Sequence, residues 1–92
     1  MPRAGADSAF YLVERRLAQL VFPRASGESL TRWVARVEAS RPVAVATAPL
    51  PGLLALHYRY RFDPAGLGTL ELAALDAGAR AWLAAHTAPV PR

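Results

Sequence analysis

The chain has 92 residues, a length that forms one domain. Its 53% hydrophobic content excludes a disordered chain, and its net charge of +4 favours anionic partners. The absence of cysteine excludes a disulfide framework, a thiolate metal site and a thiol nucleophile, and no apolar run approaches the roughly 20 residues that span a bilayer.

The first predicted helix covers residues 8–21. Apolar side chains recur there every three or four positions, which is the spacing of one buried helical face. Asp7 or Ser8 is a suitable N-cap, because a short polar side chain can accept a hydrogen bond from the first free backbone N–H groups. Residues 1–6 before it are expected to be disordered.

The second predicted helix covers residues 29–41, with Ser29 as its N-cap. It ends before Pro42, since the residue before a proline is disfavoured in the helical conformation. Residues 42–49 alternate small apolar side chains and contain two prolines. We expect them to be extended or irregular.

Residues 50–62, with the sequence LPGLLALHYRYRF, fit two secondary structures. At a period of two, large apolar and aromatic side chains alternate with Ala, His and Arg, as in a strand. At a period of 3.6, a wide apolar arc forms that includes His57 and Arg61, and Pro51 suits a first helical turn. Thirteen residues exceed the usual strand length of about 3–10, so we predict a helix.

The last predicted helix covers residues 69–86, with Thr69 as its N-cap. Gly78 lies inside this helix among alanines, and we expect it to let another helix approach closely. Residues 87–92 should fray.

The predicted fold is therefore all-α, a compact four-helix domain in which the third helix is central. The single domain spans residues 1–92, with an ordered core over about 8–86. The helices are predicted near residues 8–21, 29–41, 50–62 and 69–86.

Three stretches, FPRASGESLTRWVARVE, LLALHYRYRFDP and ARAWLAAH, together resemble a known family. They are similar to the helical C-terminal domain of unknown function of bacterial membrane-anchored transglutaminase-like proteins. Phe62 and Asp63 stand where the family has Tyr and Gly. The positions that match the family pattern are Pro23, Arg24, Gly27, Glu28, Ser29, Arg36, Arg59, Arg61 and Pro64.

The resemblance implies a helical third segment and a non-catalytic accessory or protein-interaction role. It implies a parent chain anchored in the membrane, with this domain on the cytoplasmic side of the bacterial inner membrane. Any transglutaminase-like activity, with its Cys-His-Asp chemistry, would then belong to another domain of the parent, so this chain is not expected to be an enzyme.

Arg61 is the candidate for a buried charge. It falls within the apolar arc of the third helix, and a buried guanidinium is costly unless it is paired and hydrogen-bonded. Glu14, at the edge of the first helical stripe, and Glu28, in the matched GES segment, are the candidate partners. We predict a structural ion pair between Arg61 and one of these acids.

Aromatic residues interleaved with arginine give a possible interaction surface, predicted to comprise Tyr58, Arg59, Tyr60 and Arg36. Such a pattern can stack and clamp single-stranded nucleic acid, so the alternative function is a small Arg-rich nucleic-acid-binding module. All eleven basic residues are arginines spread along the chain, which makes that alternative weak. Two widely separated histidines predict no metal site, and we predict no cofactor and no catalytic residue.

Overall fold

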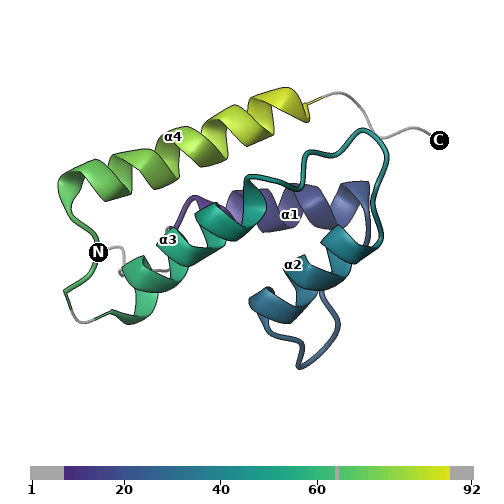
Figure 1. The fold of residues 1–92 in the computed structure, drawn as a ribbon, viewed down its shortest axis with the longest axis horizontal. Coiled ribbons are helices and arrows are strands. Elements are labelled where there is room, and N and C mark those ends of the chain that lie inside the picture. Colours follow the sequence, from purple (N-terminus) through teal and green to yellow (C-terminus); the bar gives the residue numbers. More distant parts are fainter. Residues whose placement is uncertain (1–7, 64, 88–92) are drawn as a thin grey trace.

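The computed structural model describes residues 8–63 and 65–87, so the predicted cap Asp7, the disorder of residues 1–6 and the tail beyond residue 87 lie outside it. The described residues form four helices and no strand, which confirms the predicted all-α fold (Figure 1). None of these helices is long and apolar enough to cross a bilayer. The helices are α1 (Phe10–Leu20), α2 (Leu30–Ala39), α3 (Leu50–Phe62) and α4 (Thr69–Ala85).

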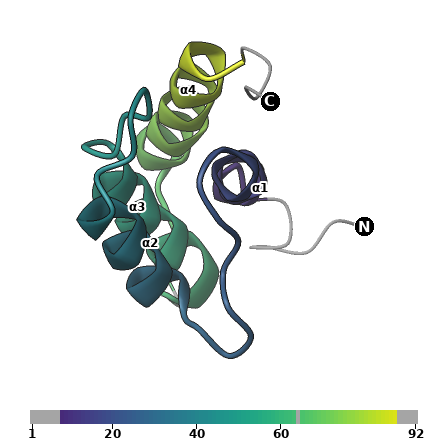
Figure 2. The same cartoon turned by 90° about the vertical axis from the view of Figure 1, so that its right-hand side faces the viewer.

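Helix α3 is central, as predicted, because it packs against each of the other three helices. Helix α4 runs along one side of the bundle and covers both α1 and α3 (Figure 1). The turned view places α1 across the bundle from α2, which packs against α3 (Figure 2). The position of α2 therefore depends on α3 and on the connections at its own two ends.

The α3 segment is helical despite its strand-like alternation. Its buried side chains are Leu50, Leu53, Leu54 and His57, a spacing of three, four and seven that only a helix brings to one face. Pro51 lies in the first turn, where a missing N–H costs no intrahelical hydrogen bond. The helical prediction is confirmed.

The core contains large side chains from all four helices. Gly78 of α4 faces Leu53 of α3, and a Cβ atom built on this glycine would lie 2.6 Å from Leu53 Cδ2. The predicted close approach of a second helix at Gly78 is therefore confirmed. The largest fully buried side chains are Trp33, Phe10, Leu17, Leu50, Leu75, His57, Val13 and Val37.

Serine hydroxyls lie at the starts of α1 and α2, but only Ser29 occupies a cap position, because Ala9 and not the predicted Ser8 is the N-cap of α1. Ser29 Oγ accepts a hydrogen bond from the Arg32 N–H at 3.2 Å, which confirms the predicted cap of α2. Ser8 Oγ accepts from the Phe10 N–H at 3.3 Å just before α1. Both contacts satisfy a backbone donor that has no partner within the helix.

The start of α4 differs from the prediction by one residue. Thr69 is the first helical residue, and Gly68 occupies the cap position. A glycine has no side chain to accept a hydrogen bond, so the Glu71 carboxylate reaches back instead and accepts from the Gly68 N–H at 3.3 Å.

The connection between α2 and α3 is irregular, as expected, and the end of α4 holds it in place. The Trp82 indole Nε1–H donates to the Ala46 carbonyl at 2.8 Å, and the Ala46 N–H donates to His86 Nε2 at 3.0 Å. His86 Nδ1 lies 2.6 Å from the Trp82 carbonyl. A carbonyl can only accept, so Nδ1 carries the proton and Nε2 is the free acceptor that Ala46 uses.

Candidate functional site

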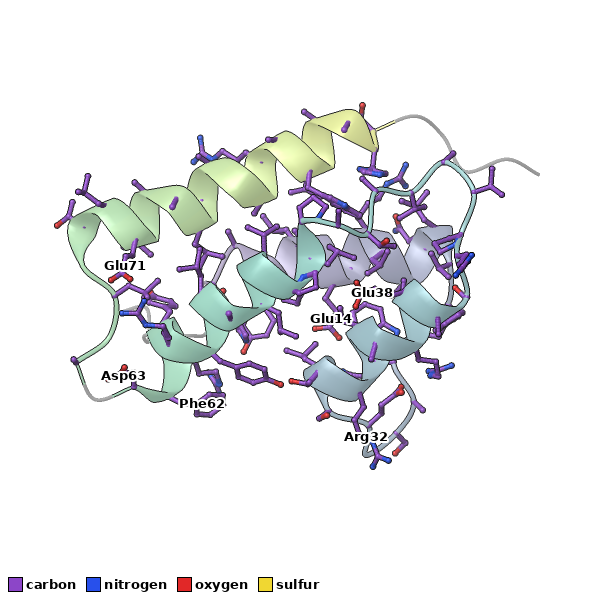
Figure 3. All side chains as sticks on the ribbon, in the orientation of Figure 1. Glu14, Arg32, Glu38, Phe62, Asp63 and Glu71 are labelled. Atoms are coloured by element: carbon purple, nitrogen blue, oxygen red, sulfur yellow. The ribbon has the colours of Figure 1, made fainter. Side chains whose placement is uncertain are left out.

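Arg61 does not form the predicted buried ion pair. Its side chain is exposed in the last turn of α3, where its guanidinium lies 5.5 Å from the centroid of the Phe62 ring. Phe62 is itself 64% exposed and points away from the helices in Figure 3. Arg61 lies four residues after the buried His57, but its long side chain carries the charge to water at the end of the helix. The prediction is wrong because the last fully buried residue of α3 is His57, one turn before Arg61.

The two candidate acids pair with other arginines. Glu14 Oε2 accepts from Arg24 Nε at 3.2 Å. Glu28 accepts from Arg36 through two contacts, at 2.9 Å from Nε and 2.7 Å from Nη2. These pairs join the connection between α1 and α2 to both helices.

Glu28 organises that connection. Its carboxylate also accepts from the Ala25 N–H at 2.9 Å, and its backbone carbonyl accepts from Arg24 Nη1 at 3.1 Å. The hydrogen bonds from Arg36 and Ala25 lower the pKa of the Glu28 carboxyl from its usual 4.5 to about 2.

We expect Glu28→Gln to lower the melting temperature at neutral pH, because a neutral amide loses the charged contacts to Arg36. The folded carboxylate keeps its charge down to about pH 2, whereas the unfolded one is protonated near 4.5. Its contribution to stability is therefore complete above pH 4.5 and is lost as the pH falls toward 2. Thermal melts across this range, with Glu38→Gln as a matched control on α2, should show the difference between wild type and variant shrinking. A constant difference would contradict the assignment.

The predicted surface of Tyr58, Arg59, Tyr60 and Arg36 is not one surface. Arg36 is held by Glu28 and lies 4.3 Å above the Phe22 ring. Tyr58 faces α2, where its Oη accepts from Thr31 Oγ1 at 3.2 Å, and Tyr60 packs half-buried against the core.

Arg59 points the other way, toward α4. It pairs with Glu71 through both terminal guanidinium nitrogens, Nη1 to Oε2 and Nη2 to Oε1, the latter at 3.2 Å. Figure 3 shows Glu71 at the start of α4. Neighbouring residues on a helix point to different sides. Tyr58 therefore faces α2 while Arg59 faces α4, and the predicted surface residues of α3 are separated.

A recess lies beside Arg61, between α1, the connection from α1 to α2, and the C-terminal half of α3. Its volume is about 210 Å³. It brings Tyr58 and Arg61, both predicted site residues, together with Phe62 and two residues that the sequence did not single out for this role, Tyr11 and Arg24. The lining residues are Tyr11, Arg24, Ser29, Leu30, His57, Tyr58, Arg61 and Phe62.

His57 lies against this recess with only 1% of its surface exposed. Its Nδ1 is 2.7 Å from Ser8 Oγ, and its ring makes an edge-on contact with Tyr11 at 5.0 Å between centroids. The pairing with Ser8 was not predicted, although a histidine on an apolar stripe signals that a polar partner is needed. Ser8 is only 4% exposed, so the pair is placed for packing and not for nucleophilic attack.

Burial of the ring, together with the positive charge of Arg61, lowers the pKa of His57 below its usual value of 6.5. The unfolded chain therefore takes up a proton near pH 6.5 that the folded chain resists. The contribution of His57 to the free energy of unfolding is complete above this pH. It falls as the pH decreases toward the folded pKa, by at most about 1.4 kcal/mol per pH unit for one proton.

Urea unfolding of wild type and His57→Phe, followed from about pH 7 to about pH 5.5, measures this contribution. We expect the free energy of unfolding to fall more steeply in the wild type. His86 is present in both proteins and does not affect the comparison. Parallel profiles would show that His57 titrates alike in the folded and unfolded chains.

Within residues 8–63 and 65–87, no three His, Asp or Glu side chains gather in a way that could hold a metal ion. Comparisons of the chain with protein-family models, with curated proteins and with solved structures found no match. The resemblance to transglutaminase-like proteins therefore stays a prediction from the sequence motifs.

Proposed function

We propose that this chain is a non-catalytic protein-interaction domain and that the recess beside Arg61 is its contact site. The observation that carries the proposal is the lining itself. Tyr11, Tyr58, Phe62 and two arginines surround one depression, and Tyr and Arg are enriched among the residues that dominate binding energy at protein interfaces. Arg61 and Phe62 are exposed at its rim, where a partner can reach them.

The parent protein in this proposal is a membrane-anchored transglutaminase-like protein, with the domain on the cytoplasmic side of the bacterial inner membrane. The motif resemblance supports this part, and the chain has no cysteine for that family's chemistry. The full-length gene tests it. We expect a transmembrane helix directly upstream, and reporter fusions should place the domain in the cytoplasm. A parent gene without such a helix would overturn this part.

The interaction itself is tested with a partner purified after capture by the full-length protein. Isothermal titration should show that the double variant Arg61→Ala, Phe62→Ala binds it at least about ten-fold more weakly. Arg80→Ala, an exposed arginine on α4, is the matched control and should bind like the wild type. Equal binding by both variants would remove the recess as the contact site.

Nucleic acid is the alternative partner, and the same aromatic rings beside arginine favour it, because bases stack on such rings. Phosphate contacts give a steep decrease of affinity with salt concentration. Binding of single-stranded DNA or RNA with such a salt slope would support the alternative, and no binding at low salt would remove it.

A further inference from the structure

We infer that the recess beside Arg61 binds a carboxylate side chain of an acidic protein segment, and that His57 makes this binding tighter as the pH falls. The inference rests on the proposed function and names the chemistry of the partner. It follows from the charges of the recess, its hydrogen-bond donors, its size and the position of His57.

The recess has positive charge and no negative charge in its lining. Arg61 has no carboxylate partner among residues 8–63 and 65–87, and Arg24 shares its charge with Glu14 through Nε. A guanidinium binds a carboxylate through strong charge-assisted hydrogen bonds, especially where apolar walls exclude water. Phe62, Tyr58 and Leu30 form such walls.

The hydroxyl groups of the lining add donors. Tyr58 Oη accepts a hydrogen bond from Thr31, which leaves its own proton free to donate. Ser29 Oγ accepts from the Arg32 N–H and has a free proton for the same reason. Tyr11 brings a third hydroxyl from α1. Residues that carry a hydroxyl thus line the recess from α1, from the start of α2 and from α3.

The buried His57 supplies the link to pH. Its Nδ1 is engaged by Ser8, and no described residue bonds to Nε2. No buried polar side-chain atom of the described residues lacks a partner, so Nε2 lies within the 1% of His57 that is exposed, and His57 lines the recess. A protonated ring would donate through Nδ1 to Ser8 and through Nε2 to a bound anion.

The charged and titratable groups that face His57 set its response. They are Tyr11 from α1, Arg24 from the connection, and Tyr58 and Arg61 from α3, with no carboxylate among them. In the free protein the positive charge of Arg61 opposes protonation of the ring. A bound carboxylate reverses this effect, and by linkage a proton on His57 then strengthens carboxylate binding.

The volume of the recess and the small number of unpaired arginines around it favour one carboxylate over a nucleic acid. A volume of about 210 Å³ is smaller than the pockets of about 300–1,000 Å³ that hold drug-sized ligands, and it suits a single side chain. Binding a phosphate backbone needs several free cations along a groove, whereas Arg36 and Arg59 are paired with Glu28 and Glu71.

The test is an NMR titration of the whole chain with two blocked peptides, acetyl-Ala-Leu-Glu-Leu-Ala-amide and its Gln counterpart, at about pH 6 and about pH 7.5. We expect only the Glu peptide to shift the signals of the recess, to raise the pKa of His57 and to bind more tightly at the lower pH. Arg61→Ala should weaken binding about ten-fold or more, and Arg80→Ala should not change it. His57→Phe should lose the tightening of binding between about pH 7.5 and about pH 6.

Equal binding of the two peptides, or wild-type binding by Arg61→Ala, would overturn the inference. Tighter binding of inorganic phosphate than of the Glu peptide would overturn the choice of a carboxylate. If neither peptide binds but the purified partner still needs Arg61 and Phe62 for its binding, the inference fails while the proposed function stands. If the Glu peptide binds but the purified partner binds the double variant Arg61→Ala, Phe62→Ala as tightly as it binds the wild type, the anion site stands and the proposed function fails.

Discussion

Replacing Trp33 by alanine is expected to lower the free energy of unfolding by about 3–5 kcal/mol, the usual loss for a buried tryptophan. Trp33 is fully buried, and its indole Nε1–H donates to the Phe22 carbonyl at 3.2 Å. Its loss would leave a cavity where α2 packs on α3, and would release the connection that precedes α2. A domain of this length is stable by only about 5–14 kcal/mol, so the variant should be partly unfolded or should melt more than about 12 °C lower.

Two further variants separate packing from hydrogen bonding at this site. Trp33→Phe keeps an aromatic ring and loses the donor to Phe22, so its loss should be clearly smaller than that of the alanine variant. Arg32→Ala changes the exposed neighbour and should stay within about 0.5 kcal/mol of the wild type. Urea unfolding measures all three. A Trp33→Ala variant as stable as Arg32→Ala would contradict the packing described for α2.

The fold was predictable because helix signals are local. The spacing of apolar residues, the length of the segment and Pro51 identify α3 from the sequence alone, and Ser29 marks the start of α2 in the same way. Strand-like alternation over residues 54–62 did not prevail, because the backbone groups at the edges of a strand need a partner strand, and residues 42–49 are irregular and supply none.

The site was less predictable because it depends on which helix or connection packs against each turn of α1 and α3. A helical period places Arg61 in line with His57, but it does not say that Arg61 is exposed and that no residue of α3 after His57 is fully buried. The period also marks Glu14 as an acid that needs a partner. The choice of Arg24 depends on the path of the connection from α1 to α2, which no local signal encodes. The Ser8–His57 contact joins residues 49 positions apart and has the same origin.

Replacing Trp82 by alanine is expected to cost a similar amount, about 3–5 kcal/mol, and to free residues 42–49 as well. Trp82 is 3% exposed, stacks on His86 at 4.1 Å between ring centroids, and donates to the Ala46 carbonyl at 2.8 Å. The same stack orients His86, whose Nε2 accepts from the Ala46 N–H. Hydrogen exchange at the Ala46 amide should therefore accelerate more than exchange in the middle of α1, once both rates are corrected for the loss of global stability.

The two effects of Trp82 can be told apart because Ala46 is exposed to water. In Trp82→Phe the ring still fills the core and can still stack on His86, and water can hydrogen-bond to the released carbonyl. The loss should then be only about 0.5–1.5 kcal/mol, with a modest increase of exchange at Ala46. Arg80→Ala, on the exposed side of α4, is the control and should change neither quantity. If Trp82→Ala accelerates exchange at Ala46 no more than in α1, residues 42–49 are held by contacts other than Trp82 and His86.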